Sequence, residues 1–170
     1  MLEINTLIGL PVDRWKEYRD IRLEMTKNDS WAFTPNHEDL LKLSEEEWKS
    51  ELEDKRNTYF FLEDSGVLVG MSSIRTHIYN QFKHNVSFDM LYVNPEYRGR
   101  DLGKRLTEER IDYVKEQGGV KNVICEIFSS QIPSLEFHKQ LGFEEVGRIK
   151  DFAQYEGKYF DSVFMQLELA

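Results

Sequence analysis

A strand-like segment that runs into a basic, glycine-containing loop is the part of the chain best suited to chemistry. The stretch from residue 87 to 105, SFDMLYVNPEYRGRDLGKR, reads as a buried strand, a turn at Asn94-Pro95, the loop and the first turn of a helix. The free backbone N–H groups of such a loop and the positive end of the helix dipole both favour a bound phosphate. Basic side chains add positive charge at the same place, namely Arg98, Arg100, Lys104 and Arg105. The stretch therefore predicts a site for an anionic, phosphate-bearing cofactor.

Two common phosphate-binding patterns do not fit this loop. No Gly-Lys-Ser/Thr sequence follows it, so it is not a P-loop, and a kinase or ATPase that uses a magnesium nucleotide is disfavoured. The Rossmann fingerprint also fails, because its glycine spacing and its downstream ribose-binding acid are missing. The phosphate is expected to belong to another kind of cofactor.

Glu126 and His138 are the side chains whose types suit proton transfer. Glu126 lies in the apolar run VICEIF, where an unpaired buried carboxylate is costly, so it should face a wet cleft or a partner. A carboxylate can take a proton from an amine, and histidine, whose ordinary pKa is about 6.5, can give one to a leaving group. Asp89 is a second candidate base. The alternatives are a structural hydrogen bond or ion pair for Glu126, and a packed helix histidine that bonds a carbonyl for His138.

The composition favours a folded, acidic protein. The 170 residues fit one domain, 1–170, and the net charge of −9 argues against a nucleic-acid partner, because duplex binding needs a basic surface. No apolar stretch approaches the roughly 20 residues that cross a bilayer. The single cysteine, Cys125, fits a reducing compartment. We therefore expect a cytoplasmic protein without nucleic-acid or membrane partners. His37, His77 and His84 show no ligand spacing, so no metal site is predicted.

The elements that must position these residues alternate between strands and helices. Period-2 patterns predict strands over residues 2–8, 58–63, 67–79, 86–93 and 122–129, and two more within 144–169. Helical spacing and capping signals predict helices over residues 13–25, 39–43, 44–52, 101–117 and 133–141. The order predicts one mixed α/β domain: antiparallel strands, a strand–helix–strand crossover, a helix and a terminal hairpin.

Four residues outside the loop are candidates for contact with a second substrate. Arg22 lies on the apolar stripe of the first helix, where an arginine needs a partner or a cleft. Trp31 and Phe33 lie in a break between helices and either wall a binding cleft or pack the loop on the core. Tyr155, near the terminal hairpin, is a candidate for the same site or for the proton donor.

Taken together, YVNPEYRGRDLGKRL and CEIFSSQIPSLEFHKQLGFEEVG resemble the GNAT superfamily of acetyl-CoA-dependent N-acetyltransferases. The resemblance covers residues 58–169, and the family's pyrophosphate-loop pattern, R/Q-x-x-G-x-G/A, falls on residues 98–103. It implies a central mixed, mostly antiparallel sheet of about seven strands flanked by about four helices. It also implies transfer of an acetyl group from acetyl-CoA to a primary amine of a small molecule or peptide, by direct attack in a ternary complex. The alternative is a non-catalytic acyl-CoA-binding sensor or regulatory module. The sequence names neither the acceptor nor the oligomeric state, monomer or homodimer.

The resemblance also implies roles for individual residues. Main-chain groups around residues 91–93 would receive the acetyl-pantetheine part, backbone N–H groups of 99–104 the pyrophosphate, and Gln131 the pantetheine arm. The implied cofactor-binding residues are Leu91, Tyr92, Val93, Arg98, Gly99, Arg100, Asp101, Leu102, Gly103, Lys104, Gln131, Ser134 and Phe137. Glu126 would be the general base through water, and His138 stands where relatives often carry a tyrosine as general acid. The implied acceptor-side residues are Arg22, Trp31, Phe33, Asp89 and Tyr155.

Asp101 departs from the family's loop pattern, because it occupies the first glycine of the G-x-G. A carboxylate about 4 Å from a phosphate charge, at an effective dielectric constant of about 20, would cost on the order of 4 kcal/mol. The carboxylate is therefore expected to point away from the phosphate, and aspartate tolerates the unusual backbone this needs. Without cofactor, Asp101 is expected to cap the following helix by bonding the N–H of Gly103 or Lys104.

Overall fold

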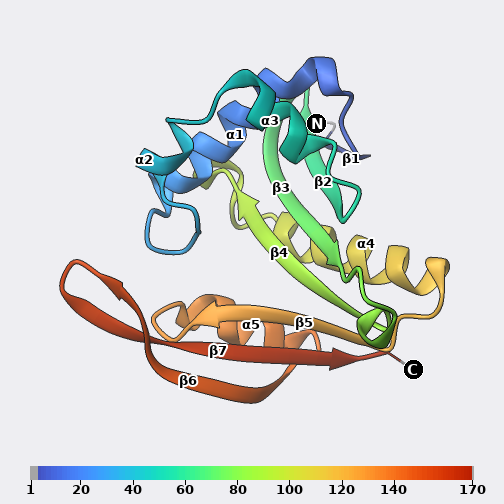
Figure 1. The fold of residues 1–170 in the computed structure, drawn as a ribbon, viewed down its shortest axis with the longest axis vertical. Coiled ribbons are helices and arrows are strands. Elements are labelled where there is room, and N and C mark those ends of the chain that lie inside the picture. The colour runs from blue at the N-terminus through green and yellow to red at the C-terminus, as the bar shows by residue number, and fades with distance from the viewer. Residues whose placement is uncertain (1–3, 170) are drawn as a thin grey trace.

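A seven-stranded sheet in the order β1-β2-β3-β4-β5-β7-β6 organises the molecule (Figure 1). The computed structural model describes residues 4–169. Its strands are β1 (Ile4–Ile8), β2 (Asn57–Asp64), β3 (Val67–Thr76), β4 (Asn85–Val93), β5 (Asn122–Phe128), β6 (Glu144–Tyr155) and β7 (Lys158–Glu168). Every neighbouring pair is antiparallel except β4 with β5, which is parallel. The predicted mixed, mostly antiparallel sheet is confirmed.

The α-helices are α1 (Trp15–Asn28), α2 (His37–Leu40), α3 (Glu45–Leu52), α4 (Leu102–Gln117) and α5 (Ile132–Gln140). Short 3-10 turns lie at Val12–Arg14, Asn80–Phe82 and Pro95–Tyr97. The 3-10 turn at Val12–Arg14 replaces the start of the first predicted helix, and residues 2–3 of the first predicted strand lie outside the described residues. Within residues 4–169, no helix has the length and apolar character to cross a membrane.

Two apolar cores lie on opposite faces of the sheet. Side chains from α4 and α5 pack on one face, and side chains from α1, α2 and α3 pack on the other. The alternation in β2 shows why, since Tyr59 and Phe61 enter the α1 core while Phe60 and Leu62 enter the α4 core. The sequence TYFFLE is apolar throughout because this strand is covered on both sides.

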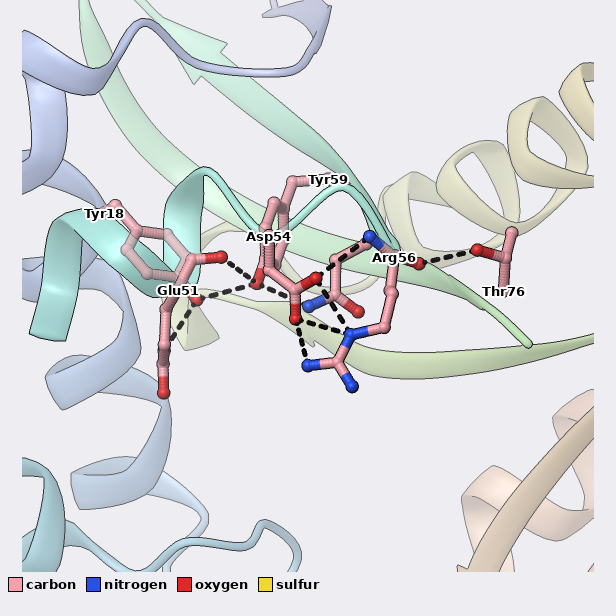
Figure 2. A network of polar contacts seen from close by, with 7 residues as sticks. Tyr18, Glu51, Asp54, Arg56, Tyr59 and Thr76 are labelled. Atoms are coloured by element: carbon pink, nitrogen blue, oxygen red, sulfur yellow. Dashed lines mark hydrogen bonds and ion pairs between the residues drawn. The ribbon is translucent and has the colours of Figure 1, made fainter. Parts of the chain in front are cut away.

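A polar network fastens α1 and α3 to the start of β2 (Figure 2). The Tyr18 hydroxyl donates to Tyr59 Oη at 3.2 Å and also lies 3.0 Å from Glu51 Oε2. Arg22, only 1% exposed, donates from Nη1 to Tyr18 Oη at 2.6 Å and to Glu51 Oε2 at 3.0 Å. The arginine on the apolar stripe has therefore found a partner within the fold, and this geometry does not support its expected contact with a substrate.

A bulge in β4 changes which face its side chains occupy. Ser73 pairs with Asp89 and Met71 pairs with Tyr92, so Met90 and Leu91 together oppose a single residue of β3. Met90 has φ 57°, a left-handed conformation that suits the extra residue of a bulge. A one-residue shift reverses the facing of every later side chain. Tyr92 consequently enters the α1 core, although Phe88, four residues earlier, lies in the α4 core.

The sheet opens between β4 and β5, which pair over only three residues. The pairs run from Asn85↔Asn122 to Ser87↔Ile124, after which the two strands separate (Figure 1). The β-bulge begins just past this point, and bulges bend the strand that carries them. This opening leaves the edge of β4 unpaired beyond Ser87 on the β5 side. The candidate active site lies in the opening.

Candidate active site

A pocket of about 430 Å³ lies where β4 and β5 separate. It is lined by Phe88, Asp89, Met90 and Leu91 of β4, by Cys125, Glu126, Ile127 and Phe128 of β5, by Gln131, Ser134 and His138 at α5, by Ala32, Phe33 and Thr34 of the α1–α2 loop, and by Arg75, Arg110 and Phe152. Of the residues expected to act, the pocket brings together Glu126, His138, Asp89, Phe33, Leu91, Gln131 and Ser134. Catalytic and binding candidates from four separate segments therefore meet in one place.

Two carboxylates, Glu126 and Asp89, face this pocket from the two separating strands. Glu126 is exposed, as a glutamate in an apolar strand must be unless it is paired, and its Oε1 accepts a hydrogen bond from Ser162 Oγ. Asp89 is more deeply placed, and burial raises the pKa of its carboxyl, an effect that Arg110 and Arg75 oppose and Glu126 reinforces. A carboxylate reachable from water and a second one with a raised pKa are suitable proton acceptors.

His138 is held in a geometry that does not suit a proton donor. It is 4% exposed, and its Nδ1 lies 2.8 Å from the carbonyl oxygen of Ser134. Since a carbonyl only accepts, Nδ1 carries the proton and Nε2 of the neutral ring carries none. Burial lowers the pKa of the ring, with Arg110 adding to the effect and the Ser134 bond opposing it. The ring is therefore neutral near pH 7, and the expected role as general acid is not supported by this geometry.

Arg110 of α4 is a pocket residue that the sequence analysis missed. Its side chain is 1% exposed, its guanidinium carbon lies 4.2 Å from the ring centre of Phe88, and its Nη1 donates to the carbonyl oxygens of Ser73 at 3.2 Å and Asp89 at 3.4 Å. Burial lowers the pKa of the guanidinium to about 9, which leaves it charged at neutral pH. The sequence held one signal, because position 110 continues the apolar side of α4 set by residues 102, 106 and 114.

The loop before α4 presents a row of free backbone donors. None of the N–H groups of residues 99–104 donates to an acceptor in the described part of the chain, where Arg98 N bonds Pro95 O and Arg105 N bonds Asp101 O on either side. Gly99 has φ 75°, a conformation that favours glycine. A Cβ at Gly103 would meet no atom within 4 Å, so the surface of the loop is open there. Free donors at the start of a 16-residue helix make an anion site that fits a pyrophosphate.

Asp101 adopts the left-handed conformation, with φ 57° and ψ 15°, in the position of the helix N-cap. Its side chain makes no capping hydrogen bond, so the expectation that the carboxylate bonds Gly103 or Lys104 is wrong. The physical reason is the backbone, because a residue with positive φ lacks the extended conformation from which an N-cap side chain reaches the N2 or N3 amide. The donors of the loop stay free.

The basic side chains of the loop are mostly occupied elsewhere. Arg98 donates from Nε to the Val93 carbonyl at 2.8 Å and pairs with Asp29 at 2.6 Å, so the arginine and that carbonyl are already partnered. Arg105 bonds the carbonyl oxygen of Ile4 at 2.9 Å and pairs with Glu109 at 2.9 Å, which ties α4 to β1. Lys104 is more available, since its one ion pair within residues 4–169, with Glu108, spans 3.8 Å between two exposed side chains. The remaining arginine of the loop, at position 100, is exposed.

Three further expected residues lie outside the pocket lining. Tyr92 is 2% exposed and its hydroxyl donates to Glu24 Oε1 at 2.7 Å, so its side chain serves the α1 face and only its main chain remains near the gap. Phe137 packs edge-on against His138, with ring centres 5.1 Å apart. Trp31 lies in the α1–α2 loop at 37% exposure and does not line the pocket.

The terminal hairpin closes toward the α1–α2 loop. Tyr155, at the end of β6, exchanges a 2.8 Å hydrogen bond with Ser30 Oγ, which agrees with the position of the hairpin tip in Figure 1. Tyr155 therefore braces the surroundings of the pocket and does not line it, whereas Phe152 of the same strand does. Phe33 lines the pocket and packs edge-on against Tyr92, with ring centres 6.4 Å apart.

Comparison with known proteins agrees with this arrangement. The model of the Acetyltransferase (GNAT) family matches residues 18–143. The L-amino acid N-acyltransferase MnaT of Escherichia coli is 32% identical over 109 residues, and the L-methionine sulfoximine/L-methionine sulfone acetyltransferase of Salmonella typhimurium is 30% identical over 109 residues. Each match covers 63% of this chain and 62% of the relative, so less than two thirds of those proteins is represented.

A solved structure shows the same fold over nearly the whole chain. The protein yncA of Salmonella typhimurium, solved with its cofactor acetyl-CoA, has a TM-score of 0.80 at 21% identity, and the match covers 98% of this chain and 95% of that one. The family model matches most of the length of this chain. The same chain has the strand order, the opening between β4 and β5 and the free donors before α4 described above. The protein belongs to the GNAT acetyltransferase family.

Proposed function

We propose that the protein transfers an acetyl group from acetyl-CoA to the primary amine of a small molecule. The observation that carries the proposal is the continuity of the site: the free N–H groups of residues 99–104 lead along α4 to a pocket that holds two carboxylates. A phosphate anchor at one end and proton acceptors at the other are what acyl transfer from a phosphate-bearing thioester requires.

The residues present fit acetyl-CoA. The backbone of 99–104, with Lys104 beside it, would hold the pyrophosphate, while Leu91, Gln131 and Ser134 line the stretch that would receive the pantetheine arm. When bound, the cofactor supplies the acetyl group as a thioester. Gln131 Nε2 donates a long hydrogen bond of 3.4 Å to the carbonyl oxygen of Ala32. The amide can exchange this bond for one to a ligand.

Glu126 is assigned the role of proton acceptor. An amine attacks only in its neutral form, so a group at the pocket must take its proton. Glu126 is open to water, and the hydroxyl of Ser162 holds one of its oxygens in place, which leaves the other free. Asp89 is the second acceptor, deeper in the same pocket.

The acceptor is assigned to the class of small amino acids and their analogues. Arg75, exposed at the end of β3, lines the same pocket as both carboxylates and forms no ion pair within residues 4–169. A guanidinium group can bind the carboxylate of an amino acid through bidentate hydrogen bonds. The carboxylates of Glu126 and Asp89 suit its ammonium group. The names of the two relatives, an L-amino acid acyltransferase and an L-methionine sulfone acetyltransferase, support the same class.

Thiol release from acetyl-CoA, measured with a panel of amines, tests the proposal. Free L-amino acids and their analogues are expected to give turnover, whereas aminoglycosides, polyamines and peptides serve as the comparison set. The variant Arg75→Gln should raise KM for amino acids by about 10- to 100-fold, the value of one lost charge-assisted contact. Binding of acetyl-CoA with no turnover on any amine would overturn the enzymatic assignment in favour of a non-catalytic binding module.

A further inference from the structure

Arg110 is a buried cation that has no ion-pair partner within residues 4–169. Its Nη2 donates to Thr107 Oγ1 at 3.1 Å and its Nη1 bonds two main-chain carbonyls, but its Nε finds no acceptor among residues 4–169. Among the described residues, no carboxylate forms an ion pair with it. A buried charge that lacks a counter-ion is costly, so chains keep one where it has a further partner. Since Arg110 lines the pocket, that partner is expected there.

The groups that face Arg110 do not form an ion pair with it in the described part of the chain. Burial raises the pKa of the Cys125 thiol to about 12, so this sulfur stays protonated beside the guanidinium. Burial lowers the pKa of the guanidinium and the charge of the Asp89 carboxylate raises it, but the two groups form no ion pair within residues 4–169. Glu126 is exposed and bonded to Ser162, and His138 is neutral. The remaining charged residue of the lining, at position 75, is another cation.

Arg110 lies on the route from the phosphate loop to the carboxylates. It follows Leu102 by eight residues of α4, which corresponds to about 12 Å of helix rise. A molecule anchored by its phosphates on residues 99–104 can extend along α4. It then passes the Arg110 guanidinium in the pocket that Asp89 and Glu126 also line.

We propose that Arg110 binds the sulfur of coenzyme A in its thiolate form and stabilises the negative charge that this sulfur acquires during acetyl transfer. The proposal rests on the proposed function. In that reaction the amine nitrogen forms a bond to the acetyl carbon, the carbon–sulfur bond breaks, and the sulfur keeps the electron pair. Glu126 takes the amine proton and later releases it to water.

This role fits what the pocket lacks. His138 carries no proton on Nε2, so a nearby acid that would neutralise the sulfur is missing from the position where the family resemblance implied one. A fixed positive charge stabilises a thiolate without any proton transfer, and it does so best when its position is set before the reaction. The bonds to Thr107 and to the carbonyls of Ser73 and Asp89 set that position.

Binding of coenzyme A and of desulfo-coenzyme A, compared by calorimetry between about pH 6 and pH 8.5, tests the role without any turnover. An alkyl thiol in water titrates at about 8.5 or above, so the thiol form dominates over most of this range. In the wild-type protein the affinity ratio of coenzyme A to desulfo-coenzyme A should rise about fivefold across the range, which corresponds to a bound thiol with its pKa lowered by about one unit from about 8.5. All protein titrations are shared by the two ligands and cancel in the ratio.

The variants separate charge from structure. Arg110→Lys keeps a cation and should retain most of the rise, whereas Arg110→Gln should reduce it to less than twofold while still binding desulfo-coenzyme A. If Arg110→Gln does not fold, the wild-type ratio decides alone, because a flat ratio overturns the proposal. A full rise in Arg110→Gln also overturns it. Failure of the wild-type protein to bind either ligand would instead contradict the proposed function.

Discussion

At the scale of single residues, the proposed reaction depends on the carboxylate of Glu126. The variant Glu126→Gln is isosteric and keeps an acceptor for Ser162, so it removes the base and little else. We expect kcat/KM to fall by about 10²- to 10⁴-fold, the usual contribution of a general base. Asp89→Asn should cost less, on the order of tenfold, if it only assists. Thiol release with a saturating amino acid acceptor measures both.

Ser162→Ala is the control for the structural alternative. If Glu126 served only as a hydrogen-bond partner, Ser162→Ala and Glu126→Gln would lower stability alike and leave the rate per folded molecule unchanged. That pattern would remove Glu126 from the mechanism. The opposite pattern, a large rate loss in Glu126→Gln alone, identifies it as the base.

His138 makes the stability of the fold depend on pH. Its pKa is lowered in the folded state, so the unfolded state binds the proton more readily, and the free energy of unfolding falls as the pH drops through about 6.5 toward the lowered value. Each unit of lowering is worth about 1.4 kcal/mol in this window. His138→Gln should therefore lose less stability than wild type between about pH 7 and pH 5. Denaturant unfolding at several pH values measures the difference.

The exposed residue His84 is the matched control for this experiment. His84→Gln should follow the wild-type curve, because folding leaves this ring exposed to water. A wild-type slope in His138→Gln would mean that the ring contributes nothing to the acid sensitivity of the fold.

At the scale of elements, the loop before α4 is the proposed anchor for the pyrophosphate of the cofactor. Asp101 combines a left-handed backbone with a carboxylate close to six free N–H groups. Asp101→Asn removes the charge and still tolerates the backbone, so it should bind acetyl-CoA about three- to tenfold more tightly at low salt. Asp101→Gly should give at least the same gain. Calorimetry at two salt concentrations measures both.

Asp101→Ala supplies the backbone control. It also lacks the carboxylate, but a Cβ without a polar group costs about 1–2 kcal/mol in the left-handed region, which offsets the electrostatic gain. If Asp101→Asn binds no more tightly than wild type, the carboxylate points far enough away to be irrelevant.

The elements themselves were largely predictable from the sequence, whereas the facing of the site residues was not. Gly118, Pro133 and the Ser44–Glu47 capping box mark the ends of helices in the structure as the sequence indicated. The bulge at Met90 and Leu91 leaves no comparable sequence pattern, yet it decides that Tyr92 faces α1. The sequence also does not reveal which distant residue satisfies a buried charge.

At the scale of the whole molecule, we assign stability to the face of the sheet covered by α1, and function to the opening between β4 and β5. Arg22 belongs to the α1 face, through its bonds to Tyr18 and Glu51. We expect Arg22→Ala to lower the free energy of unfolding by about 2–4 kcal/mol, because it leaves a cavity and breaks a buried pair. Arg22→Met fills the space and should cost less. Neither change should alter KM for the acceptor.

Denaturant titration and thiol-release kinetics on the same samples check both halves of this prediction. A tenfold rise in KM with Arg22→Met, at unchanged stability, would place Arg22 back at the substrate. Retained KM with reduced stability confirms that it acts only through the α1 face.

The three residue pairs between β4 and β5 make this junction the narrowest link in the sheet. On one side lies a ribbon of four strands, on the other a ribbon of three, and a ligand in the gap touches both. A bound ligand would therefore link the two halves of the sheet. Hydrogen–deuterium exchange should show this as slower exchange of β4 and β5 amides in the presence of acetyl-CoA, with β2 amides little changed.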